Sequence, residues 1–360
     1  MRFPEFTEEW VNVSLKDVAD FQKERISSGL LDESTYISTE NILQNFQGVQ
    51  SAISIPANTN VVAYKKNDIL LSNIRPYLKK AWFSDRIGGC SADVFVLRSK
   101  TCEPEFLYNV IASDKFINYV MSGAKGVKMP RGDKNQMESF SFSIPAVVEQ
   151  RKISRLFQLL DERIVTQNKI IEDLKKLKSA ISERLLKGVK GSTVLLSDIC
   201  DIVKGKQING ENLSESGNYY VMNGGTELSG YYDDYNVEAN TISISEGGNS
   251  CGYVQFNTSP FWSGGHCYSI QDITDNVDNL YLYHYLKSKE DAIMKLRIGS
   301  GLPNIQKKDL AMFKIKIPAV EQQLKISTFL SSLERKAEIE ERIQNALLKE
   351  KQYLLHQMFI

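Results

Sequence analysis

A basic stretch in the first half of the chain carries side chains suited to nucleic acid. Residues 72–82 (SNIRPYLKKAW) combine an amide, several cations and aromatic rings. The candidates are Asn73, Arg75, Tyr77, Lys79 and Lys80. Such groups can contact phosphates and base edges. A solvated basic turn after a strand explains them about as well, and the interleaved aromatic residues favour nucleic acid.

Two loops that begin with glycine form a second set of candidates. Their sequences are GVKMPRGDK, residues 126–134, and GSGLPNIQKK, residues 299–308. Glycine allows close approach of the backbone, and the side chains that follow could bind phosphates. These are Lys128, Arg131 and Lys134 in the first loop and Asn304, Gln306, Lys307 and Lys308 in the second. A structural turn that closes a domain is an equally good interpretation.

Signatures of catalysis do not occur in the sequence. It contains no GxxxxGK[ST], no GxGxxG after a strand, no HExxH, no GxSxG, and no NPPY-like tetrapeptide of the adenine methyltransferase type. His266 beside Cys267 is the one pair that resembles part of a metal site, and it lacks further ligands. The five scattered cysteines indicate reduced thiols. We therefore expect neither a catalytic site nor a metal.

The charge of the chain is balanced overall but unevenly distributed. Its 44 basic and 44 acidic residues cancel, which counts against a simple basic DNA-binding domain. Residues 207–286 hold ten acidic residues and no lysine or arginine, whereas residues 287–316 hold eight basic residues against three acidic ones. Neither a long apolar run nor a signal peptide is present, so we expect a cytoplasmic protein.

An internal repeat organises the chain into two modules. Residues 144–154 read IPAVVEQRKIS and residues 317–327 read IPAVEQQLKIS, identical at eight of eleven positions with an offset of 173. The same offset relates Gly126, Pro130, Lys134 and Phe140 to Gly299, Pro303, Lys307 and Phe313. Nearer the start of each module the offset drifts. We therefore expect insertions and divergence in the middles of the modules.

Each IPAV motif is followed by a long amphipathic helix. Apolar residues recur there at the a and d positions of a heptad, which is typical of a coiled coil. They are Ile153, Phe157, Leu160, Ile164, Ile171, Leu174, Ile181 and Leu185 in the first helix, and Ile326, Leu330, Leu333, Ala337, Leu347, Leu354 and Met358 in the second. Lys178 and Lys351 interrupt the stripe, where they could fix the register of pairing or, as we favour, extend to solvent.

Chain connectivity predicts that the two helices run antiparallel with a module at each end. The second helix has the same stripe to bury as the first and must return along it. Within the modules we predict strands at residues 68–72, 94–97 and 240–245, a helix at 105–121, and turns at the four Gly-Gly pairs that begin at residues 88, 224, 247 and 264. The predicted fold is α+β, with modules at residues 1–147 and 191–320 and long helices at 148–190 and 321–360.

Taken together, these features resemble the specificity subunits of type I restriction-modification systems. The resemblance rests on two diverged modules, each closed by an LPNI-type loop, an IPxxxEQ-type motif and a long helix, the second of which ends near LLHQMFI. The opening RFPEFTEEW is also similar to segments that begin such modules. The resemblance covers essentially the whole chain.

The resemblance implies two target-recognition domains related by a pseudo-twofold axis and separated by an antiparallel two-helix coiled coil. Each domain would read one half of a split site in double-stranded DNA. The implied partners are two methyltransferase subunits, which modify adenine N6 with S-adenosylmethionine, and restriction subunits with motor and nuclease activity. The chain itself would bind no cofactor, ATP or membrane. Base contacts of the acidic second module would rely on neutral side chains such as Asn223, Asn249 and Gln255.

Two other classes of protein fit parts of the pattern. A coiled-coil scaffold with two protein-binding modules would explain the repeat and the neutral charge. A nuclease with an unrecognised site is disfavoured, because no paired acidic and lysine motif stands out.

Overall fold

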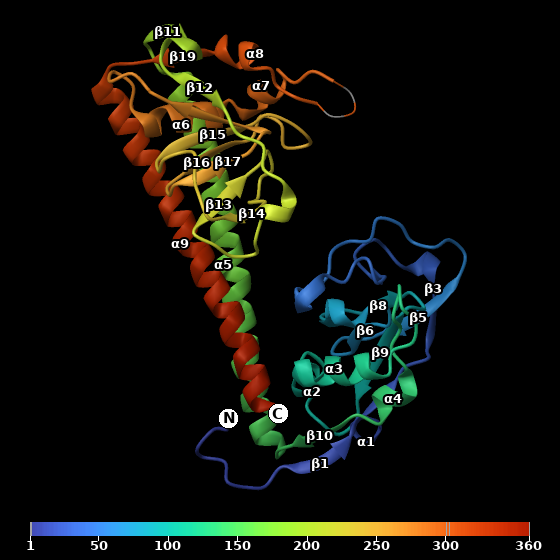
Figure 1. Cartoon of the computed structure of the whole chain (residues 1–360). Coiled ribbons are helices and arrows are strands. Elements are labelled where there is room, and N and C mark those ends of the chain that lie inside the picture. The colour runs from blue at the N-terminus through green and yellow to red at the C-terminus, as the bar shows by residue number, and fades with distance from the viewer. Residues whose placement is uncertain (1, 300, 302, 360) are drawn as a thin grey trace. The chain divides into compact units, whose positions relative to one another are not determined.

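The computed structural model describes residues 2–299, 301 and 303–359 and divides the chain into two compact units. Unit 1 comprises Met1–Asn168 and Arg342–Ile360, and unit 2 comprises Lys169–Glu341. Two long helices, α5 (Val147–Lys187) and α9 (Val320–Met358), each begin in one unit and end in the other, as the green and red ribbons of Figure 1 show. Among the described residues, no helix is long and apolar enough to span a membrane.

Unit 1 contains two four-stranded sheets and a two-stranded ribbon. The strand orders are β2-β9-β6-β7, β3-β5-β8-β4 and β1-β10. The strands are β1 (Val11–Ser14), β2 (Ala19–Phe21), β3 (Arg25–Ser27), β4 (Tyr36–Ile37), β5 (Asn60–Tyr64), β6 (Ile69–Ser72), β7 (Ala81–Phe83), β8 (Gly88–Cys90), β9 (Val94–Ser99) and β10 (Ser141–Ile144). The short helices are α1 (Leu15–Val18), α2 (Pro104–Ile111), α3 (Asp114–Ser122) and α4 (Lys134–Glu138).

Unit 2 contains a four-stranded sheet, a three-stranded sheet and a ribbon. The strand orders are β12-β18-β15-β16, β14-β13-β17 and β11-β19. The strands are β11 (Ser192–Leu195), β12 (Asp201–Lys204), β13 (Tyr219–Met222), β14 (Gly230–Tyr232), β15 (Thr241–Ser245), β16 (Val254–Asn257), β17 (Phe261–Ser263), β18 (Cys267–Gln271) and β19 (Lys314–Ile317). The short helices are α6 (Asn279–Ser288), α7 (Glu290–Met294) and α8 (Lys307–Ala311).

The two units share the topology of their main sheet. Strands β2-β9-β6-β7 match β12-β18-β15-β16 one for one, and every pair in both sheets is antiparallel. The predicted strands at residues 68–72, 94–97 and 240–245 are confirmed as β6, β9 and β15. The helix predicted at 105–121 is instead two helices. The side chain of Ser113 accepts a hydrogen bond from the N–H of Phe116 and so caps the start of the second helix. The repeat therefore extends through the diverged middles of the modules.

Strand β6 shows why some strands are runs of consecutive apolar residues. Ile69 and Leu71 face a core shared with α2, α3 and the start of α5, whereas Leu70 faces the core between the two sheets. Successive side chains of a strand point to opposite faces, so a strand covered on both sides is apolar throughout rather than alternating. All four β6 residues are buried accordingly.

The predicted turn at Gly88-Gly89 is wrong, because both glycines lie in strand β8 between β5 and β4. A Cβ atom at Gly88 would lie 2.2 Å from the carbonyl oxygen of Thr35, and one at Gly89 would lie 2.6 Å from the side chain of Val61. Glycine is required here by close packing across the strand and not by a turn.

All five cysteines are buried and unpaired. Burial raises the pKa of the Cys90 and Cys200 thiols to about 12. Because the thiolate is the reactive form, these side chains are inert packing groups at neutral pH.

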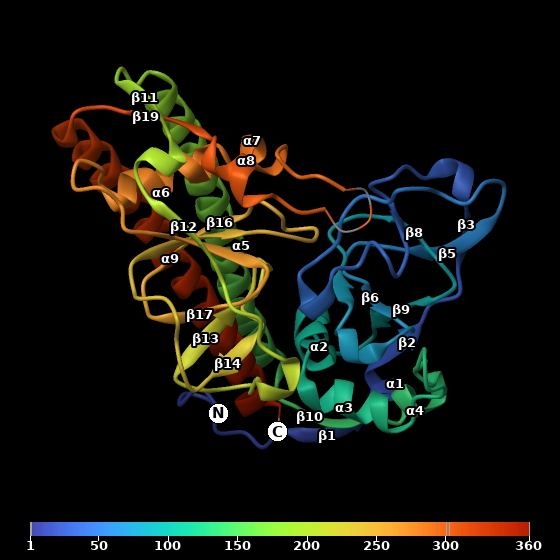
Figure 2. The ribbon, with the colours of Figure 1, turned by 45° about the horizontal axis from the view of Figure 1, so that its top comes forward.

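The long helices pair in an antiparallel arrangement within each unit, and Figures 1 and 2 both show them side by side. In unit 1, Lys351 on α9 forms an ion pair with Asp161 on α5 at 2.5 Å. In unit 2, Lys178 on α5 pairs with Glu334 on α9, also at 2.5 Å. These two ion pairs are equivalent, because both lysines and both acids are separated by the repeat offset of 173 residues.

The lysines of the heptad stripe therefore do not extend freely to solvent, and the preferred interpretation of them is wrong. Lys351 is 9% exposed, and both ammonium groups end on a carboxylate of the facing helix. A charged pair at a fixed level specifies which residues of two helices face each other. The lysines consequently set the register of pairing.

The predicted stripe residues differ in burial along the helices. Buried are Ile153, Phe157, Ile164, Ile171, Ile326, Leu330 and Met358. Half-buried are Leu160, Leu174, Ile181, Leu333, Ala337, Leu347 and Leu354, while Leu185 is exposed and Leu186 packs in its place. At the helix starts, Ile153 and Phe157 belong to the core of unit 1, and Ile326 and Leu330 belong to the core of unit 2. The stripe thus serves both helix pairing and attachment to the modules.

The repeated glutamine of the IPAV motif attaches each long helix to its module. Gln150 Nε2 donates to Pro145 O (2.8 Å), and its Oε1 accepts the N–H of Glu103, the residue that precedes α2. Gln323 does the same in unit 2, with Pro318 O (2.9 Å) and the N–H of Asp278. Buried polar groups are costly when unpaired. The motif occurs twice because each long helix is attached to its module by the same glutamine hydrogen bonds.

Replacing Gln323 with Ala should lower the free energy of unfolding by about 3 kcal/mol, because it leaves several buried main-chain groups without partners. The neighbouring exposed Gln322→Ala is the matched control and should have little effect. Urea unfolding of the full chain measures both. Equal destabilisation by the two variants would contradict this role of the motif.

Candidate nucleic-acid interface

The two candidate segments of unit 1 meet beyond the end of strand β6. Asn73 N–H donates to Asp93 O at 2.8 Å. Arg75 N–H donates to Pro130 O at 2.7 Å, and Gly132 N–H donates to Asn73 O at 3.1 Å. Residues 72–82 and 126–134, separate in the sequence, therefore form one surface.

A short hairpin completes this surface. Lys125 and Arg131 exchange both main-chain hydrogen bonds (3.0 and 2.9 Å), and Ile74 bridges to Arg131 from the other side. Gly126 has a positive φ of 98°, a conformation that L side chains rarely adopt. We name residues 73–75, 93 and 125–132 the unit 1 loop junction.

Unit 2 contains the same junction at an offset of 173. Glu246 N–H donates to His266 O (2.9 Å), and Gly248 N–H donates to Pro303 O (3.0 Å). Ile305 N–H donates to Glu246 O at 2.8 Å. We name residues 246–248, 266, 298, 299, 301 and 303–305 the unit 2 loop junction. Ser300 and Leu302, which belong to the predicted GSGLPNIQKK loop, lie outside the described residues.

The unit 1 loop junction contains two exposed arginine side chains. Arg131 is half exposed and pairs with Asp93 at 2.9 Å. Arg75 is exposed and has a positive φ of 50°, which is uncommon for a residue with a side chain. Arg75 is therefore accessible at the point where the two segments meet.

Residues 77–80 lie next to the junction and are more constrained. Tyr77 is 48% exposed. Lys79 forms an ion pair with Asp114 at 2.5 Å, and Lys80 donates to Thr39 O at 2.7 Å. The ring of Tyr77 is therefore available for stacking, while both lysines already have protein partners.

The hairpin tip and the helix after it carry the remaining unit 1 candidates. Lys128 is exposed at the tip, beside a fully exposed Val127. Lys134 begins α4, where it lies 3.5 Å from Glu138 and 5.0 Å above the ring of Phe21. Lys128 is thus placed to reach a ligand, and Lys134 is partly committed to the fold.

The unit 2 candidates are mostly neutral or basic and exposed. Asn304 lies at the base of the hairpin, Gln306 precedes α8, and Lys307 and Lys308 form its first turn; all four are exposed. Asn249 is exposed in the turn that follows the junction.

Asn223 differs, because its side chain holds the fold together. It is half-buried, and its Oδ1 accepts the N–H of His266 at 3.2 Å. The carbonyl group of this amide is therefore already used.

A buried acid in the unit 2 loop junction was not predicted from the sequence. Glu246 is 6% exposed and pairs with Lys204 at 2.7 Å. The hydroxyl of Tyr268 also donates to Glu246, at 3.0 Å. The Nδ1 atom of His266 lies 3.9 Å from its other oxygen. Extending the repeat offset to Glu246 and His266, which match Asn73 and Asp93, would have placed both in the junction.

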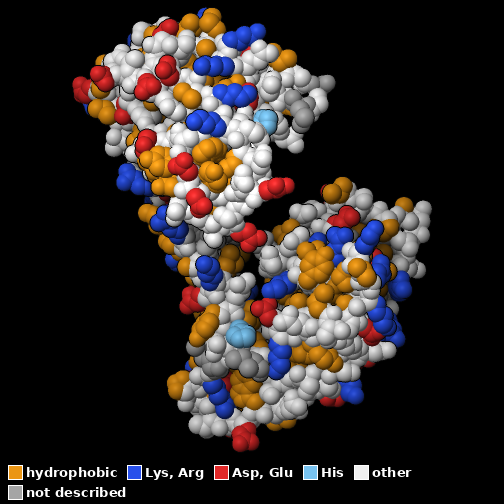
Figure 3. All heavy atoms as spheres, viewed as in Figure 1, with side chains coloured by type: hydrophobic (Ala, Val, Ile, Leu, Met, Phe, Trp, Pro, Cys, Tyr) orange, Lys and Arg blue, Asp and Glu red, His pale blue; other side chains and the backbone are white. Residues whose placement is uncertain are grey.

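Ion pairs compensate two of the four cations of the unit 1 loop junction. Lys125 pairs with Asp133 at 2.8 Å, and this hydrogen bond holds the pKa of the Asp133 carboxyl below its usual value. Figure 3 shows basic and acidic side chains interspersed on the visible faces of both units, with no single basic field. Within the described residues, no group of three or more His, Cys, Asp or Glu is placed to hold a metal ion.

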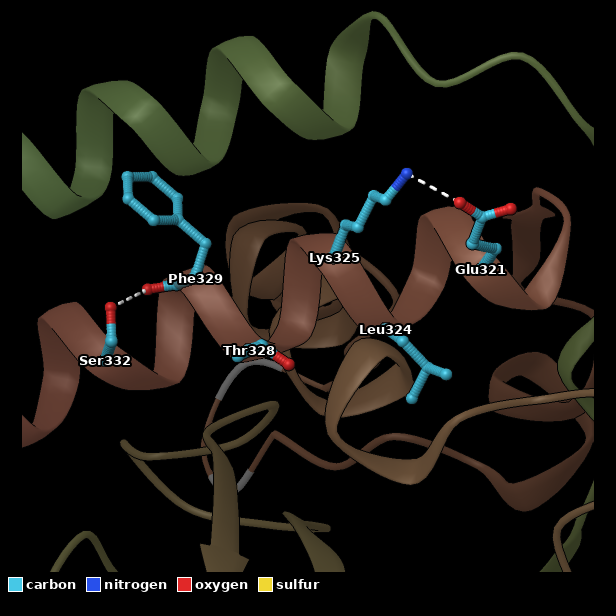
Figure 4. Close-up of a pocket in the computed structure, with 6 residues that line it drawn as sticks. All are labelled: Glu321, Leu324, Lys325, Thr328, Phe329 and Ser332. Carbon is cyan, nitrogen blue, oxygen red and sulfur yellow. Dashed lines mark hydrogen bonds and ion pairs between the residues drawn. The ribbon is translucent and has the colours of Figure 1, made fainter.

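A second exposed feature lies on the long helix of unit 2. The first turns of α9 carry a shallow apolar depression, shown in Figure 4, with Leu324 and Phe329 each about half exposed. Lys325 pairs with Glu321 at its edge, at 2.6 Å. Exposed apolar groups framed by polar ones are typical of protein interaction sites.

The duplicated junctions lie in two segments that match the same family model. The family model described as the type I restriction modification DNA specificity domain matches the chain twice, at residues 7–176 and 189–349. The chain belongs to the type I restriction-modification DNA specificity family. Each match contains one loop junction and most of the long helix that follows it.

Members of the specificity family align with this chain over different extents. A type I specificity subunit of Mycoplasma pneumoniae is 31% identical over 40% of this chain, and the match spans only 38% of that protein's length. The MjaVIII specificity subunit of Methanocaldococcus jannaschii is 24% identical over 97% of this chain and 92% of its own length.

Solved structures of the specificity family share the fold. The type I S subunit from M. genitalium has a TM-score of 0.69 at 17% identity, covering 98% of this chain and 96% of that one. A chain from a study of complex assembly in a type I restriction-modification system has a TM-score of 0.61 at 18% identity, covering 97% and 96%. The predicted α+β fold with two modules and paired long helices is confirmed.

Proposed function

We propose that this chain is the DNA-recognition subunit of a cytoplasmic type I restriction-modification complex. Each unit reads one half of a split site in double-stranded DNA, and the paired helices set the gap between the halves. The supporting observation is the duplicated loop junction, which presents different side chains on one main-chain framework. Two half-sites of different sequence need this combination, because position is set by backbone contacts and sequence is read by side chains.

The chemistry belongs to partner subunits in this proposal. Two adenine-N6 methyltransferase subunits modify the site, and restriction subunits supply motor and nuclease activity. The support is family membership, since the aligned relatives are named as specificity subunits. The chain then needs no cofactor of its own.

The depression on α9 is a docking surface for a methyltransferase subunit in this proposal. Leu324 and Phe329 supply apolar area, and the Glu321–Lys325 pair supplies a polar rim. A surface that combines exposed apolar and charged side chains has the composition of a protein interface.

Exchanging residues 15–140 for the matching module of a family member with a known target should change one half-site only. The other half-site and the gap should persist, because unit 2 and the helix pairing are untouched. Mapping of methylated adenine in DNA from cells that express the hybrid with its methyltransferase measures this. The matched exchange of residues 196–313 should alter the opposite half-site. Hybrids that methylate the original site would contradict the proposal.

Replacing Lys307 and Lys308 with Ala should weaken DNA binding by the assembled complex for every sequence alike. Both side chains are exposed in the first turn of α8, next to the loop junction, where they suit phosphate contacts. The slope of log affinity against log salt should flatten by up to about one unit per lost contact. Lys316→Ala, an exposed lysine of β19, is the control. A changed target with an unchanged slope would show that these lysines read bases.

A further inference from the structure

The described parts of the two loop junctions share their main-chain hydrogen bonds, and most of their side chains differ. Each junction has the same three main-chain hydrogen bonds and the same hairpin pair, all at an offset of 173. The residues that form these bonds differ at six positions, which are, unit 1 first, Asn73 and Glu246, Arg75 and Gly248, Asp93 and His266, Lys125 and Ile298, Arg131 and Asn304, and Gly132 and Ile305. Positions of this kind, which keep one main-chain framework and change the side chain, are suited to discriminate two half-sites.

Five of the six positions carry, in at least one unit, a residue unsuited to reading bases. Glu246 is buried and committed to Lys204 and Tyr268. Gly248 and Gly132 have no side chain, that of Ile298 is apolar, and Asp93 is engaged by Arg131. The remaining position, 131 in unit 1 and 304 in unit 2, is exposed in both and lies at the base of the hairpin.

Arg131 is already held in a defined direction. Asp93 accepts from Nη1 of the guanidinium at 2.9 Å, which leaves the other donors of the group free. An arginine fixed by a carboxylate loses less side-chain freedom when it binds. The acid also offsets its charge, so Arg131 contributes geometry more than general attraction to phosphates.

We propose that position 131/304 determines the sequence read by each unit: Arg131 reads guanine in the half-site of unit 1, and Asn304 reads adenine in the half-site of unit 2. The inference rests on the proposed function and names the residues that carry it. Arginine bonds O6 and N7 of guanine as a pair, and asparagine bonds N6 and N7 of adenine in the same way. Asp93 is a positioning residue for Arg131.

The test uses the full chain assembled with its methyltransferase partner, with mapping of methylated adenine as the readout. Arg131→Asn should relax or change one guanine position of the unit 1 half-site and leave the unit 2 half-site unaltered. Asn304→Arg should change one adenine position of the unit 2 half-site. Each variant should lower the preference for the correct base at that position by between about 5-fold and 150-fold, which is the contribution of one paired base contact.

Two further variants keep the test decisive if Arg131→Asn does not fold. Arg131→Lys keeps the charge but removes the paired donors, so the same guanine position should relax while the salt slope of binding stays constant. Asp93→Asn should weaken discrimination at that same position, although Arg131 is intact. Lys128→Ala, an exposed cation of the same hairpin, is the control and should lower affinity without altering the target.

The outcomes separate this inference from the proposed function. If the position 131 variants reduce the salt slope and leave the sequences of both half-sites unaltered, Arg131 is a phosphate contact and the inference is wrong. The exchange of residues 15–140 should still change the sequence of one half-site in that case. If that exchange changes the sequence of neither half-site, the proposed function itself fails.

Discussion

DNA binding by this chain alone should be at least about a hundredfold weaker than binding by the chain with its methyltransferase partner. Affinity for DNA comes largely from neutralised phosphates, and at 0.15 M salt three additional phosphate contacts are sufficient for about two orders of magnitude. The unit 1 loop junction offers few uncompensated cations, since Arg131 and Lys125 already pair with acids. The partner must then supply most of the electrostatic attraction.

Titrating a duplex that contains the target with the chain alone, and then with the complex, measures this difference. A duplex with both half-sites scrambled is the control for non-specific binding. The salt slope should be shallow for the chain and steep for the complex, because it counts the phosphates contacted. Equal affinities with equal slopes would show that the chain binds DNA by itself.

Inserting one heptad into each long helix should lengthen the gap between half-sites by about three base pairs. Seven residues add about 10 Å to a helix, and base pairs rise about 3.4 Å each. The insertions must face each other, and the hydrogen bond between Asn168 and Gln344 marks facing positions. They therefore belong after Asn168 in α5 and after Ile343 in α9. A heptad preserves the apolar stripe because it matches its period.

The lysine ion pairs supply the control for this insertion. Asp161 with Lys351 and Lys178 with Glu334 lie on opposite sides of the insertion points, so facing insertions preserve both pairs. A heptad added to α5 alone should mispair one of them and lower the melting temperature. Three extra base pairs also turn one half-site by roughly 100°, so methylation by the double insertion should be slower. Full activity on the original gap would contradict a spacing role for the helices.

The long helices were predictable because their signals are periodic and local. The stripe from Ile153 to Ile181 follows a heptad, and burial agrees with it until Leu186 replaces Leu185 at the end. The ion pairs of Lys178 and Lys351 were not predictable in the same way. Their partners lie more than 150 residues away in the sequence, and the acids become candidates only when the register of the helices is known.

The loop junctions were predictable in composition but not in assembly. Both segments of unit 1 were candidates, yet nothing local in the sequence says that Asn73 and Gly132 share a hydrogen bond. The constant offset of 173 held the missing information, because it continues through Asp93 and His266 where the sequences have diverged. Gly88 and Gly89 show the opposite limit, since a glycine pair required by strand packing looks like a turn.

Mapping methylated adenine across a genome, in cells that carry the methyltransferase partner with and without this chain, tests the central proposal most directly. With the chain, methylation should appear at one two-part sequence with a fixed gap, and without it those sites should be unmethylated. The variant Arg131→Asn in the same cells should alter a single position of one half. Methylation at the same sites in the absence of the chain would show that another subunit selects the target.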